Sequence, residues 1–221
     1  MYPVIALDLE TTGLDPRRDA IIEIGAVCFD GKEIIGEWQS LINPRRPIPK
    51  VISDLTSITN QMVIDKPLVE DVIDDFEKFL AEYPIIGHNI SFDLSFLRKY
   101  IPLDKNPIID TFEVASVLFP TASRYSLSAL VDKLGVQNQQ PHRALEDAKA
   151  TLDVFNRMFY MHTQKMIVSV FSDLYETSLK LPINLIAEIV NASQNITWDG
   201  AWFFQHVLKE LSRGPIPAKP A

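Results

Sequence analysis

The chain has 221 residues, of which 47% are hydrophobic and 23% are charged, the balance of a globular protein with one main domain. Its formal net charge of −8 argues against a protein that binds nucleic acid through a broad basic surface. The single cysteine, Cys28, excludes an internal disulfide and a thiolate zinc site.

The acidic balance does not exclude a phosphodiester substrate, because acids that ligate divalent ions would neutralise part of the charge. No apolar run approaches the roughly 18 residues of a transmembrane helix, and the chain opens without a basic leader segment. We therefore expect a cytoplasmic protein that makes no contact with a membrane.

Two carboxylates follow the first apolar segment of the chain. Residues 4–7 are typical of a buried strand, in which residues two apart point to the same face. Asp8 and Glu10 therefore project together, and two anions held that close either retain a proton or bind a cation. Hard oxygen ligands suit Mg²⁺ or Mn²⁺. Taken alone, the pair also fits an ordinary solvated strand end.

The segment from Thr11 to Gly13 ends this strand, and its small residues leave room for a ligand to approach the backbone. A second strand is predicted at 20–29, where apolar residues alternate with others. Asp30-Gly31 is a strong signal for a two-residue hairpin, so residues 32–42 are predicted to return antiparallel.

Helices then alternate with short apolar strands. Apolar spacing predicts helices at 53–62, 68–83, 111–118, 127–134 and about 144–161. The apolar pairs 85–86 and 108–109 each lie between helices, which is typical of parallel strands. The whole pattern predicts an α/β fold, a mixed sheet flanked by helices.

A third carboxylate, Asp93, lies in the first turn of a predicted helix that follows the strand ending at Gly87. Asn89 or Ser91 can cap that helix. The aspartate alone also fits a simple complement to the helix dipole.

A histidine and a fourth carboxylate surround the start of the helix near residue 144. Five helical residues turn the chain by about 500°, which would point His142 and Asp147 apart if both were helical. We therefore expect His142 on the loop directly before this helix, here called the lead-in loop, and Asp147 on the helix itself. A lone histidine is also a common ordinary loop residue.

Three segments taken together resemble the motifs of the DEDDh (DnaQ-like) exonuclease family, which includes the proofreading subunit of bacterial DNA polymerase III. They are D-x-E-T-T-G at 8–13, H-N-x-x-F-D at 88–93 and H-x-A-x-x-D at 142–147. The resemblance covers about residues 3–160. It implies a ribonuclease H-like fold and a metal-dependent 3′→5′ exonuclease that releases nucleoside 5′-monophosphates.

The resemblance also implies a role for each motif residue. Two divalent ions, Mg²⁺ or Mn²⁺, are assigned to Asp8, Glu10, Asp93 and Asp147. His142 is assigned as the general base, because a histidine can accept a water proton near neutral pH. The terminal nucleotide is assigned to Thr11, Thr12, Gly13, Leu14 and Phe92, although a core role fits Phe92 equally well.

The substrate class is open at this stage. Single-stranded DNA 3′ ends are the first expectation, and an RNA or oligoribonucleotide 3′ exonuclease is the alternative, because no motif reports contacts to the 2′-OH. A non-catalytic binding module on the same fold is disfavoured, since all four acids are present. A polymerase or helicase module is the expected partner.

Three regions are predicted along the chain. Residues 1–164 form the exonuclease domain, 165–212 a C-terminal helical extension or connector, and 213–221 a proline-rich, linker-like tail. The extension resembles the connector of exonuclease domains fused to DinG-type helicases. Its concentrated aromatic residues, such as Trp198 and Trp202, predict burial against the nuclease domain or a partner.

Overall fold

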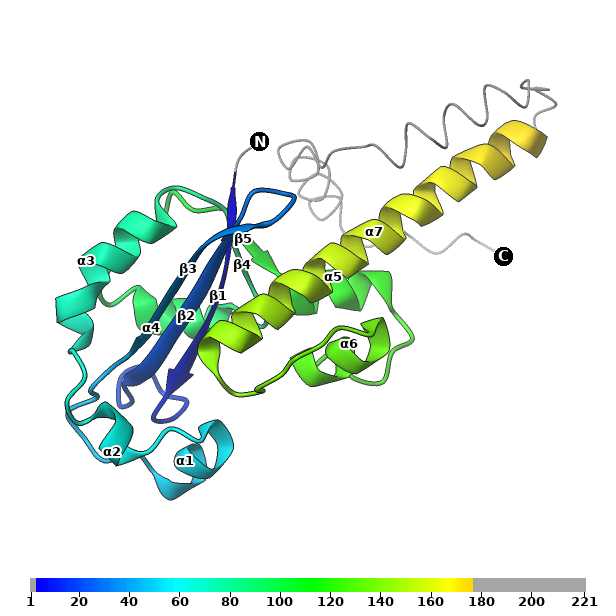
Figure 1. Cartoon of the computed structure of the whole chain (residues 1–221). Coiled ribbons are helices and arrows are strands. Elements are labelled where there is room, and N and C mark those ends of the chain that lie inside the picture. Colours follow the sequence, from blue (N-terminus) through cyan, green and yellow to red (C-terminus); the bar gives the residue numbers. More distant parts are fainter. Residues whose placement is uncertain (1–2, 177–221) are drawn as a thin grey trace.

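The computed structural model describes residues 3–176, and the side chains of residues 3–161. Five strands form one mixed sheet in the order β3-β2-β1-β4-β5 (Figure 1). The strands are β1 Val4–Thr11, β2 Ile21–Phe29, β3 Ile34–Leu41, β4 Ile85–Gly87 and β5 Ile108–Asp110. The helices are α1 Lys50–Thr56, α2 Asn60–Val63, α3 Val69–Leu80, α4 Ser91–Leu97, α5 Thr111–Leu118, α6 Leu127–Leu134 and α7 Ala144–Glu176.

The strand β1 is the junction of the sheet. It pairs antiparallel with β2 on one side and parallel with β4 on the other, and the parallel pairing confirms the prediction for residues 85–86. Its alternate residues belong to different cores. Leu7 packs with residues of α3 and α4, whereas Ala6 packs with Leu152 and Phe155 of α7. The strand period therefore places Asp8 on the face that α7 covers.

The apolar alternation of β2 does not mark a solvent-facing side. Eight consecutive residues of this strand, from Ile21 to Cys28, are buried because helices cover both faces of the sheet (Figure 1). Glu23 is among them, with an exposed fraction of 0%.

The predicted antiparallel hairpin of β2 and β3 forms, but its connection is longer than the two residues Asp30-Gly31. Four residues connect β2 to β3, and the Asp30 carboxylate accepts hydrogen bonds from the backbone N–H groups of Lys32 and Glu33 at 2.8 and 3.0 Å. The aspartate side chain thus takes the place of a backbone partner and lengthens the turn. As a result β3 begins at Ile34 rather than at residue 32.

The helix α7 is longer than the sequence predicts. It continues without interruption from Ala144 to Glu176, so the predicted boundary at residue 164 falls within a helix. The rest of the predicted extension, 177–212, and the tail, 213–221, lie outside the described residues, and this division of the chain stays a prediction. No helix in the described range 3–176 is long and apolar enough to cross a membrane.

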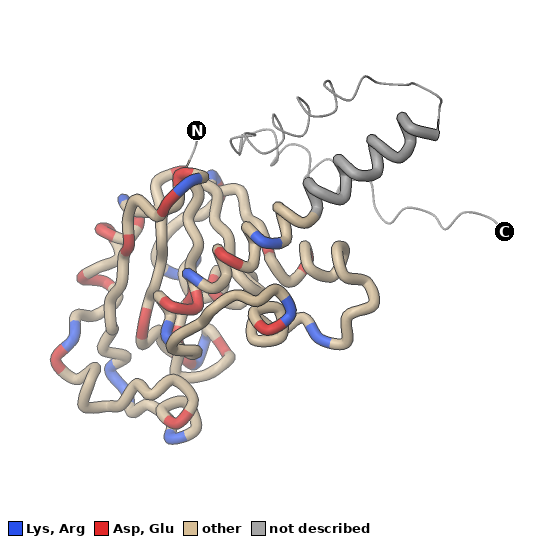
Figure 2. Tube along the Cα trace, turned by 45° about the vertical axis from the view of Figure 1, so that its right-hand side comes forward, with Lys and Arg blue, Asp and Glu red and all other residues tan. Residues whose placement is uncertain are grey.

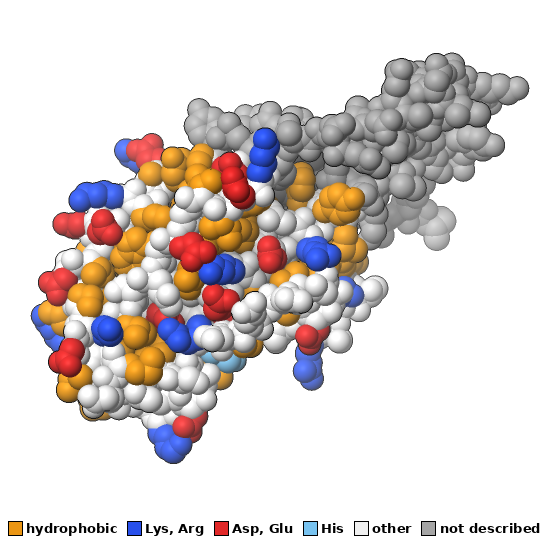
Figure 3. Space-filling view, viewed as in Figure 1, with side chains coloured by type: hydrophobic (Ala, Val, Ile, Leu, Met, Phe, Trp, Pro, Cys, Tyr) orange, Lys and Arg blue, Asp and Glu red, His pale blue; other side chains and the backbone are white. Residues whose placement is uncertain are grey.

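Charged residues are interspersed along the described trace. Figure 2 shows Asp and Glu positions beside Lys and Arg positions on helices and loops, and Figure 3 shows the same mixture, with apolar side chains between, on one face. On that face positive and negative side chains are mixed rather than gathered by sign.

Candidate active site

The four acids and the histidine of the three motifs line one pocket of about 230 Å³. They reach it from β1, from the start of α4 and from the start of α7. The lining residues are Asp8, Leu9, Glu10, His88, Asn89, Phe92, Asp93, Leu127, His142 and Asp147. The sequence motifs, which are up to about 140 positions apart, therefore converge in space as the resemblance implied.

The start of α7 lies directly against β2, and Gly25 makes this possible. A Cβ atom at position 25 would lie 2.1 Å from the Leu145 nitrogen and 2.3 Å from the Ala144 carbonyl carbon. Gly25 is also the partner of Asp8 in the β1–β2 register. The close approach therefore brings the first turn of α7, with Asp147, beside the acids of β1.

Asp93 is fixed to the strand that carries the other acids. Its Oδ1 atom accepts a hydrogen bond of 2.9 Å from the backbone N–H of Leu9, and the side chain is 3% exposed. Leu9 lies between Asp8 and Glu10, so this bond places α4 and its carboxylate next to both.

The predicted cap of α4 is wrong. Neither Asn89 nor Ser91 provides a side-chain cap bond. The carboxylate of Asp110 instead accepts hydrogen bonds from the backbone N–H groups of Asn89 and Ile90, at 2.9 and 3.1 Å. The same carboxylate caps α5 by accepting from the Phe112 N–H, so one aspartate positions two helix starts at the end of the sheet.

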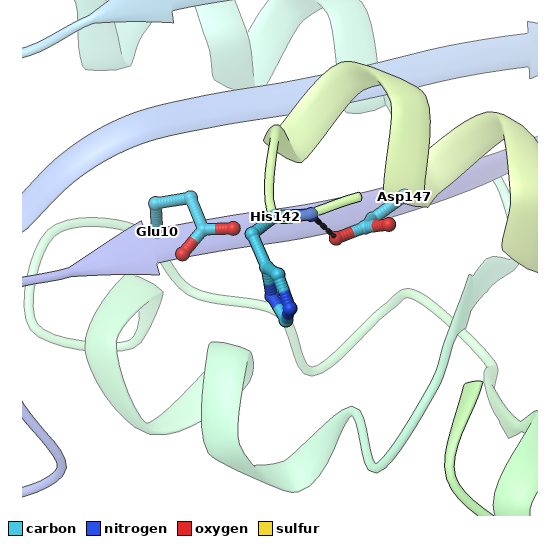
Figure 4. A group of neighbouring side chains, drawn as sticks. All are labelled: Glu10, His142 and Asp147. Carbon is cyan, nitrogen blue, oxygen red and sulfur yellow. Dashed lines mark hydrogen bonds between the residues drawn. The ribbon is translucent and has the colours of Figure 1, made fainter. Parts of the chain in front are cut away.

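His142 lies on the lead-in loop and Asp147 on the helix, which confirms the predicted arrangement (Figure 4). The Oδ2 atom of Asp147 accepts a hydrogen bond of 2.9 Å from the His142 N–H, and Oδ1 accepts one of 2.6 Å from Asn138 Nδ2. Ligand atoms of Glu10, His142 and Asp147 all lie within 4.8 Å of one another. The group is therefore compact enough to share one cation.

Burial raises the pKa values of all four acids, and the charges of neighbouring acids raise those of Asp8 and Glu10 further. Burial, followed by the charges of Asp147, Glu23 and Asp93, raises the pKa of Glu10 to about 8. Burial also raises the pKa of Asp93 to about 8, raises that of Asp8 well above its ordinary value and raises that of Asp147. Burial disfavours the charged form of each of these carboxyl groups, and a bound cation would favour it.

The donor set of the site fits divalent metal ions. Among the described side chains, no salt bridge joins Lys or Arg to any of the four acids. Carboxylate oxygens that converge without a cationic partner are the ligands that Mg²⁺ and Mn²⁺ prefer.

The residues predicted to contact the terminal nucleotide divide into two groups. Phe92 lines the pocket and also packs against the core, so both predicted roles of this residue remain open. The turn 11–14 is not part of the lining. Its role toward a nucleotide stays a prediction.

Internal contacts account for Thr12 and Gly13 of this turn. The Thr12 hydroxyl accepts a hydrogen bond of 3.0 Å from the Ala20 N–H. A Cβ atom at Gly13 would lie 2.5 Å from the Asp19 carboxylate, so the space expected for a ligand is taken by Asp19. Leu14 is 82% exposed.

Sequence reasoning missed the role of Glu23 and gave none to His88. The carboxylate of Glu23 accepts hydrogen bonds from Gln39, Arg143 and the Ala144 N–H. Its only signal was a charged residue within an otherwise apolar strand. His88 precedes Asn89 in the second motif, and its Nδ1 lies 2.9 Å from the Thr111 hydroxyl while burial lowers the pKa of the imidazole.

Comparison with known proteins gives one family match. Residues 5–155 match the family model RNase_T, which is described as exonuclease. A DNA polymerase III of the PolC type from Thermotoga maritima is 44% identical over 162 residues, which are 71% of this chain and 12% of the relative. The chain therefore spans only a small part of the PolC-type relatives that it matches.

Two further proteins are matched over most of their own length. The epsilon subunit of DNA polymerase III from Treponema pallidum is 36% identical over 167 residues, covering 72% of this chain and 78% of the subunit. The solved structure of Exonuclease X in complex with 5′-overhanging duplex DNA is 35% identical, with a TM-score of 0.56. The similarity covers 71% of this chain and 92% of that one.

Proposed function

Because the chain belongs to the RNase_T exonuclease family, we propose that it is a metal-dependent 3′→5′ exonuclease that acts on single-stranded DNA. Family membership confirms the resemblance drawn from the motifs and the ribonuclease H-like fold. The observation that carries the proposal is the convergence of four buried or half-buried acids and His142 in one pocket. The products are nucleoside 5′-monophosphates released one at a time.

The metal ligands of this proposal are the four carboxylates Asp8, Glu10, Asp93 and Asp147. Divalent ions held there would supply positive charge to the reacting phosphate and to the leaving 3′ oxygen. The raised pKa values of Glu10 and Asp93, both about 8, support this assignment, because bound cations would replace the protons.

The chain's own groups then orient and activate water. His142 accepts a proton from the attacking water as the water oxygen forms a bond to phosphorus and the bond to the 3′ oxygen breaks. The leaving oxygen takes a proton from solvent. The hydrogen bond from the His142 N–H to Asp147 ties the position of the base to that of a metal ligand.

His88, Phe92 and Leu127 line the pocket together with the acids. Aromatic faces stack on bases without regard to sequence, which suits an enzyme that removes any terminal nucleotide. The turn from Thr11 to Leu14 is retained in the proposal as a second contact to that nucleotide.

The relatives' names support the substrate and the partner of this proposal. Those relatives are DNA polymerases or a DNA polymerase subunit, which supports DNA over RNA and a polymerase over a helicase as the partner. The chain would then work as a nuclease module beside a polymerase.

The test is degradation of end-labelled DNA and RNA strands of one sequence, with Mg²⁺ or Mn²⁺. We expect mononucleotides from the 3′ end of linear DNA, and no cutting of circular single-stranded DNA. His142→Ala should lower the rate by about 10²–10⁴. Asp54→Ala, which changes an exposed acid of α1, is the control for loss of a carboxylate.

Three outcomes would contradict parts of the proposal. Cutting of the circle would indicate an endonuclease, and faster degradation of RNA would replace the DNA assignment. A His142→Ala rate equal to that of wild type would remove the histidine from the mechanism.

A further inference from the structure

Glu23 is a buried carboxylate outside the pocket lining that has every one of its acceptor directions in use. Its Oε1 atom accepts hydrogen bonds from Gln39 Nε2 at 2.9 Å and from Arg143 Nη2 at 2.6 Å. Its Oε2 atom accepts from Arg143 Nε at 3.1 Å and from the Ala144 N–H at 3.0 Å. The side chain is 0% exposed.

Two of these donors are the residues that directly follow His142. Arg143 and Ala144 lie at the end of the lead-in loop and the start of α7, and both are bound to the same carboxylate of β2. Glu23 is the partner of Glu10 in the β1–β2 register, so the two side chains leave the sheet on the same face. The carboxylate therefore fixes the loop next to the acids.

The backbone of His142 needs such support. Its φ angle is 63°, in the left-handed region, where a non-glycine residue persists only if its surroundings over-determine the conformation. The His142 N–H is held by Asp147 on one side, and the next two residues are held by Glu23 on the other. Release of either side would allow the residue to return to negative φ and turn the imidazole away.

The chemistry at position 23 requires a carboxylate. All groups that face the two oxygens are donors, and a glutamine would present its NH₂ group to one pair of them. The fork of Arg143 matches the carboxylate with two parallel bonds, which a lysine cannot reproduce.

We propose that Glu23, acting through Arg143, is a positioning residue for His142. It holds the lead-in loop in the one conformation that presents the imidazole to the pocket. The inference rests on the proposed function, in which His142 accepts the water proton. Glu23 itself touches neither substrate nor metal ion.

A double-mutant cycle on the full chain tests this role. We would measure kcat and KM on a linear DNA strand with Mn²⁺ for wild type, Glu23→Gln, His142→Ala and the double variant. A misplaced base lowers the rate, so Glu23→Gln should reduce kcat by about 10–100-fold. In the His142→Ala background the same substitution should change kcat by less than about twofold, because the group it positions is gone.

Two additional variants protect the cycle from a folding defect. Arg143→Lys keeps the positive charge but removes the fork, and it should show the same dependence on His142. If Glu23→Gln does not fold, the Arg143→Lys cycle decides. Glu82→Gln is the matched control, since Glu82 forms an ion pair with Lys105 at the same 2.6 Å distance but is 68% exposed.

The results separate this inference from the proposed function. An equal loss of kcat in both backgrounds would show a general structural effect and overturn the positioning role. An unchanged kcat in both Glu23→Gln and Arg143→Lys would overturn it as well. If His142→Ala alone has the wild-type rate, the assignment of the base fails, and the positioning role fails with it.

Discussion

Glu10 and Glu23 lie opposite each other on adjacent strands, yet their electrostatic surroundings are opposite. Glu23 is bound by a guanidinium, an amide and a backbone N–H. Glu10 is surrounded by other carboxylates, and its pKa is raised to about 8. The comparison teaches that burial alone does not assign a role to a carboxylate. A complete set of donors indicates a structural support, whereas neighbouring anions indicate a cation site.

Asp8→Ala is the strongest test of the acids that line the pocket, and we expect it to have the largest effect. Burial raises the pKa of this carboxyl group well above its ordinary value, and the charges of Asp93, Asp147 and Glu10 raise it further. Activity should fall by about 10³-fold, the worth of several kcal/mol of charge stabilisation. The metal-free variant should melt no lower than wild type, because repulsion is relieved. Exonuclease rates and thermal melts with a chelator check both, and full activity of the variant would refute the metal assignment.

Glu23→Ala tests the carboxylate that is paired with Arg143. Removal of one partner of a buried ion pair costs about 3–5 kcal/mol, and we expect the lower value because the Arg143 side chain is 25% exposed and can be hydrated. Glu10→Ala should leave the free energy of unfolding unchanged or raise it near pH 8. Urea unfolding of both variants without metal gives the two free energies of unfolding. Similar losses of stability in the two variants would contradict the distinction between a paired and an unpaired carboxylate.

The pH dependence of stability tests the raised pKa values of the acids in the pocket. Glu10 and Asp93 have folded pKa values of about 8, raised above their ordinary values of 4.5 and 3.8. Between these ordinary pKa values and a pH of about 8, the folded state binds more protons than the unfolded state. Stability is therefore fully present below the ordinary pKa values and is lost as the pH rises to about 8.

Each such group contributes a slope of at most about 1.4 kcal/mol per pH unit. Urea titrations at several pH values with a chelator would measure it. Saturating Mg²⁺ should flatten the decline, because cations replace the protons. A metal-free protein whose stability rises from pH 5 to pH 8 would contradict the raised pKa values.

The part of the site that could be predicted depends on local periods. Asp8 and Glu10 follow from the two-residue period of a strand, and the separation of His142 from Asp147 follows from the helical turn. Both rules act within a few residues. The grouping of Asp93 with these acids is predicted only from the resemblance of its motif to the DEDDh family, and the structure places Asp93 in the same pocket.

The part that could not be predicted depends on contacts between distant segments. Arg143 and Glu23 are 120 positions apart, and no pattern near either residue indicates the other. Asp110 replaces the predicted caps of α4 from a position 20 residues beyond Ile90. In each case a polar side chain satisfies backbone or charged groups of another element, which only the packed fold brings within reach.

The close approach at Gly25 also limits which sequences can carry this site. A single methyl group at that position would occupy the space of the α7 backbone at Ala144 and Leu145, so helix and sheet would have to separate. Such a substitution removes no charged group and touches no substrate, and it leaves all three motifs intact. A homologue with a side chain there could therefore keep every motif letter and still lose the alignment of Asp147 with the acids of β1.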